Sequence, residues 1–265
     1  MAGRHNRGMN DLRKCALLVA YHGGAFCGFQ RQPAVPTVQE SLETAWKAVT
    51  SESVVMHGSG RTDSGVHAWG QVVHFSTDSK IPAEDMVSAF NAHLPEKAVV
   101  RAAADVPVDF HASSSSCGKR YFYRLALGAT RPVLSSGLTA WDRTSHLDLL
   151  AMREAVTYLL GEHDFAAFAA AGRSTKTSVR CLRSLHIRPI RGGIGFFVEG
   201  SGFLYKMVRN LVGSLVEVGK GRRAPIWVET VLESRDRRRA GVTAAPEGLV
   251  LWRSLYSQDP FSTLL

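Results

Sequence analysis

The sequence predicts a mixed fold of helices and strands, either α+β or α/β, for three reasons. Segments with the helical repeat of apolar residues alternate along the chain with short strand-like segments. The chain has 265 residues, of which 45% are hydrophobic, so it can bury a substantial core in one large domain or two of ordinary size. No repeat of solenoid length is present. A globular protein with both kinds of element is therefore expected.

The N-terminal part begins with a buried strand and an amphipathic helix. Residues 15–21 form a compact apolar run that ends at Gly23 and Gly24, which is typical of a buried strand. Thr37 and Glu40 then form a capping box, which predicts the start of a helix. Apolar residues follow at helical spacing, namely Val38, Leu42, Ala45, Trp46 and Val49.

A glycine-rich loop separates the next two predicted strands. The strands are expected at 53–57 and 71–76, so that residues 58–68 connect them. A helix is expected to open at 81–85, and 98–103 has the pattern of another strand. Because loops on rigid strands often carry chemistry, the connecting loop is the first candidate for a functional site.

The C-terminal part continues the alternation. Residues 119–127 alternate cleanly between two faces, as a strand requires. One face carries Tyr121, Tyr123, Leu125 and Leu127, and the other carries Arg120, Phe122 and Arg124. Helices are expected at about 147–160, 203–218 and 225–235, and strands near 180–190, 194–200 and 248–256. We expect a basic mobile tail at 1–12, an N-terminal lobe at 13–108, a C-terminal lobe at 109–258 and a tail at 259–265.

The charge of the chain points to a polyanionic partner. Lysine and arginine total 32 against 23 aspartates and glutamates, which gives a net charge of +9 and a pI near 9.7. Nucleic acid is the leading candidate, because each neutralised phosphate releases condensed counterions. Solvated surface charge is the ordinary alternative for any single basic residue. The basic residues that could line an RNA groove are Arg173, Lys176, Arg180, Arg183, Arg222, Arg223, Arg235, Arg237, Arg238 and Arg239.

The cysteines and the apolar runs predict a cytoplasmic location. The four cysteines contain no Cys-x-x-Cys pair, so neither a disulfide framework nor a thiolate zinc site is indicated. No apolar run approaches the roughly 20 residues of a membrane span, and the N-terminus lacks the apolar stretch of a secretory signal.

The segment Gly58-Ser-Gly-Arg-Thr-Asp-Ser-Gly-Val-His-Ala68 centres on Asp63 and allows two interpretations. If the guanidinium of Arg61 lies within ion-pair distance, it keeps the carboxylate ionised and therefore nucleophilic. Alternatively, the segment is a surface turn in which Asp63 caps local amides, which is the more common use of an isolated Arg-x-Asp. Spacing alone does not decide between the two.

A longer match favours the first interpretation. Residues 60–75, Gly-Arg-Thr-Asp-Ser-Gly-Val-His-Ala-Trp-Gly-Gln-Val-Val-His-Phe, resemble the active-site motif of the A family of tRNA pseudouridine synthases. The resemblance extends in family order over nearly the whole chain. Further matching blocks lie at 28–33, 37–39, 94–95, 110–112, 120–123, 161–165, 202–210 and 245–249.

The resemblance implies an α+β pseudouridine synthase fold with two lobes that share a mixed, mostly antiparallel sheet flanked by helices. It implies an isomerase that turns uridine into pseudouridine at positions 38, 39 and 40 of the tRNA anticodon arm, without a cofactor and as a homodimer. Asp63 matches the family's catalytic aspartate, and Tyr121 its active-site tyrosine, whose ring could stack on an extruded uracil. Arg209 would pair with Asp63 or a phosphate, Leu249 would pack near the base, and His67 would buttress the loop.

Three alternatives and two departures remain. A half-buried strand position explains Tyr121, and a core strand explains Leu249, without any function. A noncatalytic RNA-binding or RNA-chaperone protein could share the fold. His57, His67 and His74 with Asp63 invite a metal hydrolase, but none has a recognised zinc-ligand spacing, so no metal is assigned. The departures are His22 where the family usually has Asp, and Ser113 where it usually has Arg; both affect the expectation for substrate preference rather than for the reaction.

Overall fold

The computed structural model describes residues 12–172 and 176–262, and within them ten strands form one sheet. The strands are β1 (Arg13–Tyr21), β2 (His57–Gly58), β3 (His67–Thr77), β4 (Ala98–Val106), β5 (Ser116–Leu127), β6 (Ala140–Asp142), β7 (Gly161–Asp164), β8 (Val179–Ile190), β9 (Gly193–Gly200) and β10 (Leu249–Tyr256). Their order is β4-β1-β3-β10-β5-β9-β8-β7, with β2 on β3 and β6 on β5. Only the β10–β3 and β5–β6 pairs are parallel, so the α+β prediction with a mixed, mostly antiparallel sheet is confirmed.

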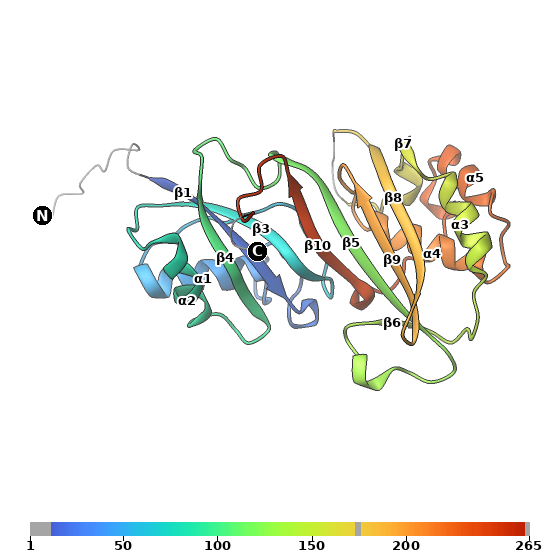
Figure 1. The fold of residues 1–265 in the computed structure, drawn as a ribbon, viewed down its shortest axis with the longest axis horizontal. Coiled ribbons are helices and arrows are strands. Elements are labelled where there is room, and N and C mark those ends of the chain that lie inside the picture. Colours follow the sequence, from blue (N-terminus) through green and yellow to red (C-terminus); the bar gives the residue numbers. More distant parts are fainter. Residues whose placement is uncertain (1–11, 173–175, 263–265) are drawn as a thin grey trace, which may run out of the picture.

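Helices α1 (Val38–Thr50) and α2 (Ala83–Asn91) lie at one end of the sheet (Figure 1). Helix α1 begins where the capping box predicts, and the Thr37 side chain accepts a hydrogen bond from the Glu40 amide. The indole of Trp46 stacks on the ring of Phe90, with 5.0 Å between ring centroids, and both side chains are fully buried. These contacts join the two helices to the inner face of β1, β3 and β4.

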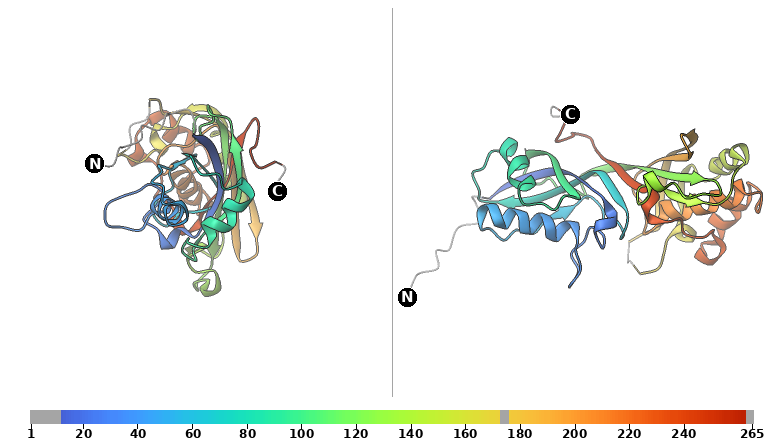
Figure 2. Two further views of the ribbon diagram at one scale, coloured as in Figure 1. Left: turned by 90° about the vertical axis from the view of Figure 1, so that its left-hand side faces the viewer. Right: turned by 90° about the horizontal axis from the view of Figure 1, so that it is seen from below.

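Helices α3 (Leu149–Thr157), α4 (Met207–Gly219) and α5 (Trp227–Ser234) lie at the other end of the sheet (Figure 2). They form a second apolar core with β5, β8 and β9. Leu249 belongs to this core and Leu251 to the core under α1, and both side chains come from the same face of β10. The two cores therefore lie on one face of the sheet, on either side of β10.

The predicted boundaries of the strands at 53–57 and 71–76 are wrong, and contacts outside the predicted segments explain both. The backbone N–H of Met56 donates to the carboxylate of Glu43 instead of a neighbouring strand, so β2 pairs only from His57. Strand β3 begins at His67, four residues before the predicted start, because His67 and Ala68 pair with β10. Strands β6 and β7 are short, and the sequence did not predict them.

The helix predicted at 203–218 begins later than expected. Lys206 adopts a left-handed backbone conformation with φ = 59°, and the helix starts at the following residue. Phe203 and Lys206 therefore belong to the segment that leads into α4, and the side chains of Arg209 and Asn210 on this helix are buried.

The ends of the chain and the outer face of the sheet complete the fold. Most of the tail predicted at 1–12 lies outside the described residues, and so do the last three residues of the tail predicted at 259–265. Phe261 is buried on the sheet face opposite the helices, against Ala16 and Leu18. None of the helices in the described part of the chain has the length and apolar character needed to span a lipid bilayer. The lobe boundaries stay predictions.

Candidate active site

The loop that carries Asp63 is fixed at its first residues to two strands of the sheet. The amide of Ser59 donates to the carbonyl of Val72 at 2.7 Å, and its hydroxyl lies 2.6 Å from the hydroxyl of Ser254. The side-chain amide of Gln71 donates to the carbonyl of Gly60 at 2.6 Å. Strands β3 and β10 therefore both position the start of the loop.

The second half of the loop is held by the last residue of β1 and by the segment that follows this strand. The hydroxyl groups of Tyr21 and Thr62 lie 2.7 Å apart, and the amide of Phe29 donates to the Thr62 carbonyl at 3.1 Å. A turn from Asp63 to Val66 follows, with a 3.1 Å hydrogen bond, and Gly65 takes φ = 80° within it. The backbone on both sides of Asp63 is thus defined by hydrogen bonds, as a preorganised site requires.

Asp63 forms an ion pair with Arg209, one of the two partners that the sequence allowed for that arginine. The Nη1 atom of Arg209 donates to Oδ2 of Asp63 at 3.2 Å, and its Nε donates to the carbonyl of Ala244 at 2.7 Å. Arg209 is 8% exposed, so the pair lies largely out of water. The planar guanidinium bonds to both groups at once and fixes the direction of the carboxylate.

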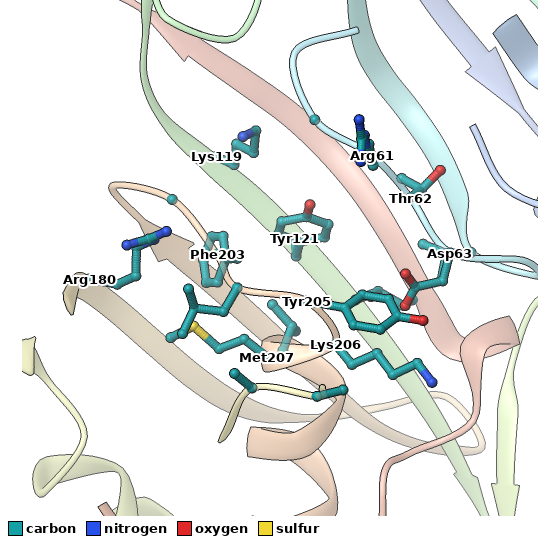
Figure 3. Close-up of a pocket in the computed structure, with 18 of the residues that line it drawn as sticks. Arg61, Thr62, Asp63, Lys119, Tyr121, Arg180, Phe203, Tyr205, Lys206 and Met207 are labelled. Carbon is teal, nitrogen blue, oxygen red and sulfur yellow. The ribbon is translucent and has the colours of Figure 1, made fainter. Parts of the chain in front are cut away.

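The expected ion pair between Arg61 and Asp63 is not formed in the described structure. Arg61 is exposed, and in Figure 3 its side chain lies apart from the carboxylate of Asp63. The chain turns at Asp63, where the amide of Val66 donates to the Asp63 carbonyl, so nearness in sequence does not bring these two side chains together. The charge that orients Asp63 comes from α4 instead.

Tyr121 stands on β5 at the boundary between the two apolar cores and packs against both. Its ring meets Phe203 edge to face, with centroids 5.1 Å apart. Burial raises the pKa of Tyr121 above its ordinary value, and the nearby Tyr21 and Asp63 raise it further. The phenol is therefore neutral over the physiological pH range.

Asp63 and Tyr121 line one cavity of about 630 Å³, shown in Figure 3. Leu249 lies in its wall, at the start of β10. Sequence reasoning missed Lys119, Phe203 and Lys206, which also line it. For Lys119 a signal existed, because strand alternation places it on the face of Tyr121. The remaining wall includes the backbone from Gly58 to Thr62, residues Ala169 and Ala170, Arg180, and the segment from Gly202 to Val208.

His67 lies behind the loop and does not line the cavity. Its Nδ1 accepts a hydrogen bond from the amide of Gly23 at 3.0 Å, and its ring meets His22 edge to face, with centroids 4.6 Å apart. Burial lowers the pKa of His67, and His22 lowers it further, so the ring is neutral. His67, which was expected to support the loop, and His22, where the family usually has Asp, therefore contact each other.

The other two histidines of the metal hypothesis lie apart from Asp63. His74 is buried and accepts a hydrogen bond from the amide of Ala112 at 3.2 Å, while the exposed His57 stacks on it. Over residues 12–172 and 176–262, no group of three or more histidine, cysteine, aspartate or glutamate side chains is arranged to hold a metal ion. His74 is a packed, hydrogen-bonded histidine.

The basic residues singled out in the sequence differ in their surroundings. Arg180 lines the cavity, whereas Arg222, Arg235 and Arg238 form ion pairs with carboxylates on the surface. Arg237 donates hydrogen bonds to Asn210 and Thr243. Arg173 lies outside the described residues. Of the basic residues that were expected to line an RNA groove, Arg180 is therefore the one that lines the cavity among the described residues.

Comparison with known proteins agrees with this geometry. A family model described as tRNA pseudouridine synthase matches residues 17–113 and 155–257. The chain is 44% identical over 245 residues to tRNA pseudouridine synthase A of Myxococcus xanthus, covering 92% of both chains. It is 40% identical to tRNA pseudouridine synthase A 2 of Clostridium perfringens, covering 92% of this chain and 100% of the relative. It is 41% identical to tRNA pseudouridine synthase A of Geobacillus kaustophilus, covering 95% and 96%.

The fold, the single aspartate and the family match together define an RNA-modifying isomerase. The matched residues cover well over half of the chain and include the loop of Asp63, both sheet halves and the helix of Arg209. The chain belongs to the tRNA pseudouridine synthase family.

Proposed function

We propose that this enzyme converts uridine to pseudouridine at positions 38, 39 and 40 of the tRNA anticodon stem-loop, with Asp63 as the nucleophile. The observation that carries the proposal is the position of Asp63, on a hydrogen-bonded loop at the wall of a cavity and ion-paired to Arg209. A carboxylate held in this way is aimed, which is what nucleophilic attack requires.

The reaction breaks the bond between N1 of uracil and C1′ of ribose and forms a bond between C5 and C1′. C5 loses a proton and N1 gains one, so the base is isomerised and nothing is consumed. Asp63 either attacks the nucleotide or assists cleavage of the glycosidic bond, and both routes use the same carboxylate. The neutral hydroxyl of Tyr121 is able to donate or accept a hydrogen bond as these protons move.

The cavity suits a nucleotide that has left the RNA stack. A single base must be extruded to reach an enclosed carboxylate, which costs a few kcal/mol that contacts to the base offset. The ring of Tyr121 and the apolar side chains of Phe203 and Leu249 line the wall. Aromatic and apolar groups of this kind stack on a base without regard to its hydrogen-bonding edge.

The test is the mapping of pseudouridine in tRNA incubated with purified protein. The wild-type chain should modify uridines 38, 39 and 40, and Asp63→Asn should modify none. Asp109→Asn, which changes an exposed aspartate outside the cavity, is the matched control and should keep full activity. Normal modification by Asp63→Asn would overturn the assignment of Asp63, and modification confined to other tRNA positions would overturn the assignment of the substrate.

The remaining expectations from the sequence are part of the proposal. We infer a homodimer acting on tRNA in the cytoplasm and a reaction that needs no cofactor. The stacked and half-exposed Trp69 and Trp252 on the outer sheet face are consistent with a partner surface. Sedimentation of the purified chain tests the dimer, and activity after dialysis against a chelator tests the cofactor. A noncatalytic RNA-binding protein would bind tRNA in the same assay but form no pseudouridine.

A further inference from the structure

The cavity carries positive charge that its own side chains leave unbalanced. Among the described residues that line it, Asp63 is the one carboxylate, and its charge is already balanced by Arg209. Four basic side chains also line the cavity, namely Arg61, Lys119, Arg180 and Lys206. A cavity with this charge favours an anionic ligand beyond the neutral uracil ring.

Lys119 is the most enclosed of these four cations and has no acceptor in the described part of the protein. It lies on β5, on the same face as Tyr121 and two residues before it. It makes no hydrogen bond or ion pair with any described residue. Its Nζ lies against the backbone of Gly60, because a Cβ added to that glycine would meet the ammonium at 3.1 Å.

An enclosed ammonium without an acceptor is costly for the free protein. A charged group that leaves water loses hydration free energy, which a partner normally offsets. Burial lowers the pKa of Lys119, and the neighbouring Arg180 lowers it further. Folding alone gives no reason to place a lysine here, so the position suggests a ligand that supplies the missing anion.

Arg180, on β8, provides the second cation on this side of the cavity. Its Nη1 donates to the carbonyls of Thr177 and Val179, at 3.0 and 2.6 Å, and no carboxylate of the described chain pairs with it. Its Nε and Cδ pass close to Gly202, 3.7 Å from the place where a Cβ would stand. In Figure 3, Lys119 and Arg180 lie on one side of Tyr121 and Asp63 lies on the other.

We propose that Lys119 and Arg180 together bind one backbone phosphate of the RNA, one of the two phosphodiesters that flank the uridine in the cavity. The inference rests on the proposed function, because it takes the nucleotide to lie between Tyr121 and Asp63. The sugar and base then occupy that side of the cavity, and the backbone leaves past the two cations. An ammonium and a guanidinium facing one space match a phosphate better than a neutral carbonyl.

The test uses tRNA in which a single phosphate is replaced by a neutral methylphosphonate. The substitution is placed in turn at each phosphate flanking the target uridine and at two phosphates of the acceptor stem. Binding is measured by titration with the purified full-length wild type, Lys119→Met and Arg188→Met. Arg188→Met is the matched control, because it removes one positive charge from the exposed face of β8.

The wild type should lose more than about tenfold in affinity at one flanking methylphosphonate, because tenfold corresponds to one charge-assisted hydrogen bond and two cations lose their charged acceptor there. Lys119→Met should bind unmodified tRNA about tenfold more weakly and lose less than the wild type at that phosphate, because Arg180 is then the one proposed contact left to it. The slope of log affinity against log salt should fall by about one for this variant. Lys119→Arg should restore both values, and Arg188→Met should behave as the wild type.

Equal sensitivity of the wild type and Lys119→Met at every flanking phosphate would overturn the proposal. Folding is checked separately by thermal unfolding, where Lys119→Met should be at least as stable as the wild type; a large loss of stability would mean that Lys119 serves the fold. The binding readout is independent of catalysis. The wild type could form no pseudouridine and still be more sensitive than Lys119→Met to one flanking methylphosphonate. In that case the proposed function fails and the phosphate site stands.

Discussion

Arg209 donates a hydrogen bond to Asp63 at 3.2 Å across 146 positions of sequence. Arg209 comes from α4 in the second core, and Asp63 from the loop between β2 and β3. The ion pair therefore joins the two halves of the sheet at the cavity. Because both partners are largely buried, the pair orients the carboxylate more firmly than a surface ion pair could.

Arg209→Lys should lower kcat by about a hundredfold or more while changing KM little. Lysine keeps the charge, but a single ammonium cannot bond at once to Asp63 and to the carbonyl of Ala244 as the guanidinium does. Misdirection of a catalytic group by about 1 Å costs on this order. Steady-state pseudouridine formation at varied tRNA concentration gives kcat and KM, and a single-turnover experiment gives the rate constant of the chemical step. A wild-type rate in Arg209→Lys would show that charge alone is sufficient.

Tyr121→Phe should fold as the wild type but lose activity, whereas Tyr121→Leu should lose both. Phenylalanine keeps the edge-to-face contact with Phe203 and the packing between the cores, and it removes only the hydroxyl. Loss of a group that moves a proton typically costs about 10² to 10⁴ in rate. Thermal unfolding and the modification rate are the two measurements. Full activity of Tyr121→Phe would show that the hydroxyl is not needed for the reaction and that only the aromatic ring contributes.

Deprotonation of Tyr121 should not reduce the activity between pH 8 and pH 10. Its pKa is raised above the ordinary value of 10.0, so the hydroxyl keeps its proton throughout this range. The rate of single-turnover modification measured against pH is the check, with circular dichroism to exclude unfolding. A loss of activity centred near pH 9 that disappears in Tyr121→Phe would contradict the raised pKa.

His74 should make the fold less stable as the pH falls from 6.5 towards 4. Burial lowers the pKa of His74 from 6.5 to about 4, and the facing His111, His57 and Lys14 lower it further. The unfolded chain binds the proton first, so the stability is complete above pH 6.5 and is lost as the pH falls to about 4. The difference corresponds to on the order of 3 kcal/mol.

Urea unfolding at pH 7 and pH 5 tests this expectation, with His74→Asn as the comparison. Asparagine offers an acceptor for the amide of Ala112 but has no proton to bind in this range. Its stability should therefore change less with pH than that of the wild type. Equal pH dependence in the two proteins would assign the effect to other groups.

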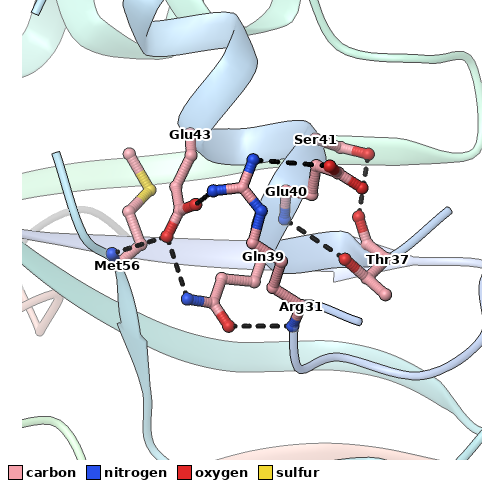
Figure 4. Close-up of polar contacts among 7 residues, drawn as sticks. All are labelled: Arg31, Thr37, Gln39, Glu40, Ser41, Glu43 and Met56. Atoms are coloured by element: carbon pink, nitrogen blue, oxygen red, sulfur yellow. Dashed lines mark hydrogen bonds and ion pairs between the residues drawn. The ribbon is translucent and has the colours of Figure 1, made fainter. Parts of the chain in front are cut away.

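The buried carboxylate of Glu43 should contribute more to stability than its ion pair suggests (Figure 4). It accepts hydrogen bonds from the side chains of Arg31 and Gln39 and from the amide of Met56. Glu43→Ala leaves the buried amide of Met56 and the half-buried side-chain amide of Gln39 without this acceptor, at a cost of about 2 to 4 kcal/mol. Arg31→Ala removes a half-exposed partner and should cost less than about 1 kcal/mol. Urea midpoints of both variants decide the comparison.

Elements that are specified by neighbouring residues could be predicted from the sequence. The capping box at Thr37 and the alternation at 119–127 give α1 and β5 with nearly correct bounds. The start of β3 could not be predicted, because His67 pairs with a strand about 180 residues away. The start of α4 was also missed, since the left-handed Lys206 is unusual for a residue other than glycine.

The same distinction applies to the site. The motif around Asp63 and the family resemblance identified the loop, the tyrosine and the arginine of α4. Arg61 was assigned from its nearness in sequence and is wrong as the partner of Asp63, because the direction of a loop side chain depends on backbone geometry. Lys119 was missed although the alternation of β5 places it on the face of Tyr121, because the sequence does not show that this lysine lies beside the cavity without an acceptor among the described residues.

Strand β10 stands between β3 and β5, although it is the last strand of the described chain. Each core can begin to form as its own segment leaves the ribosome, but the sheet is discontinuous until residues 249–256 have been synthesised. Contacts so far apart in sequence form late in folding. The nascent chain is therefore expected to hold two unjoined halves, and the cavity to close around Asp63 only near the end of translation.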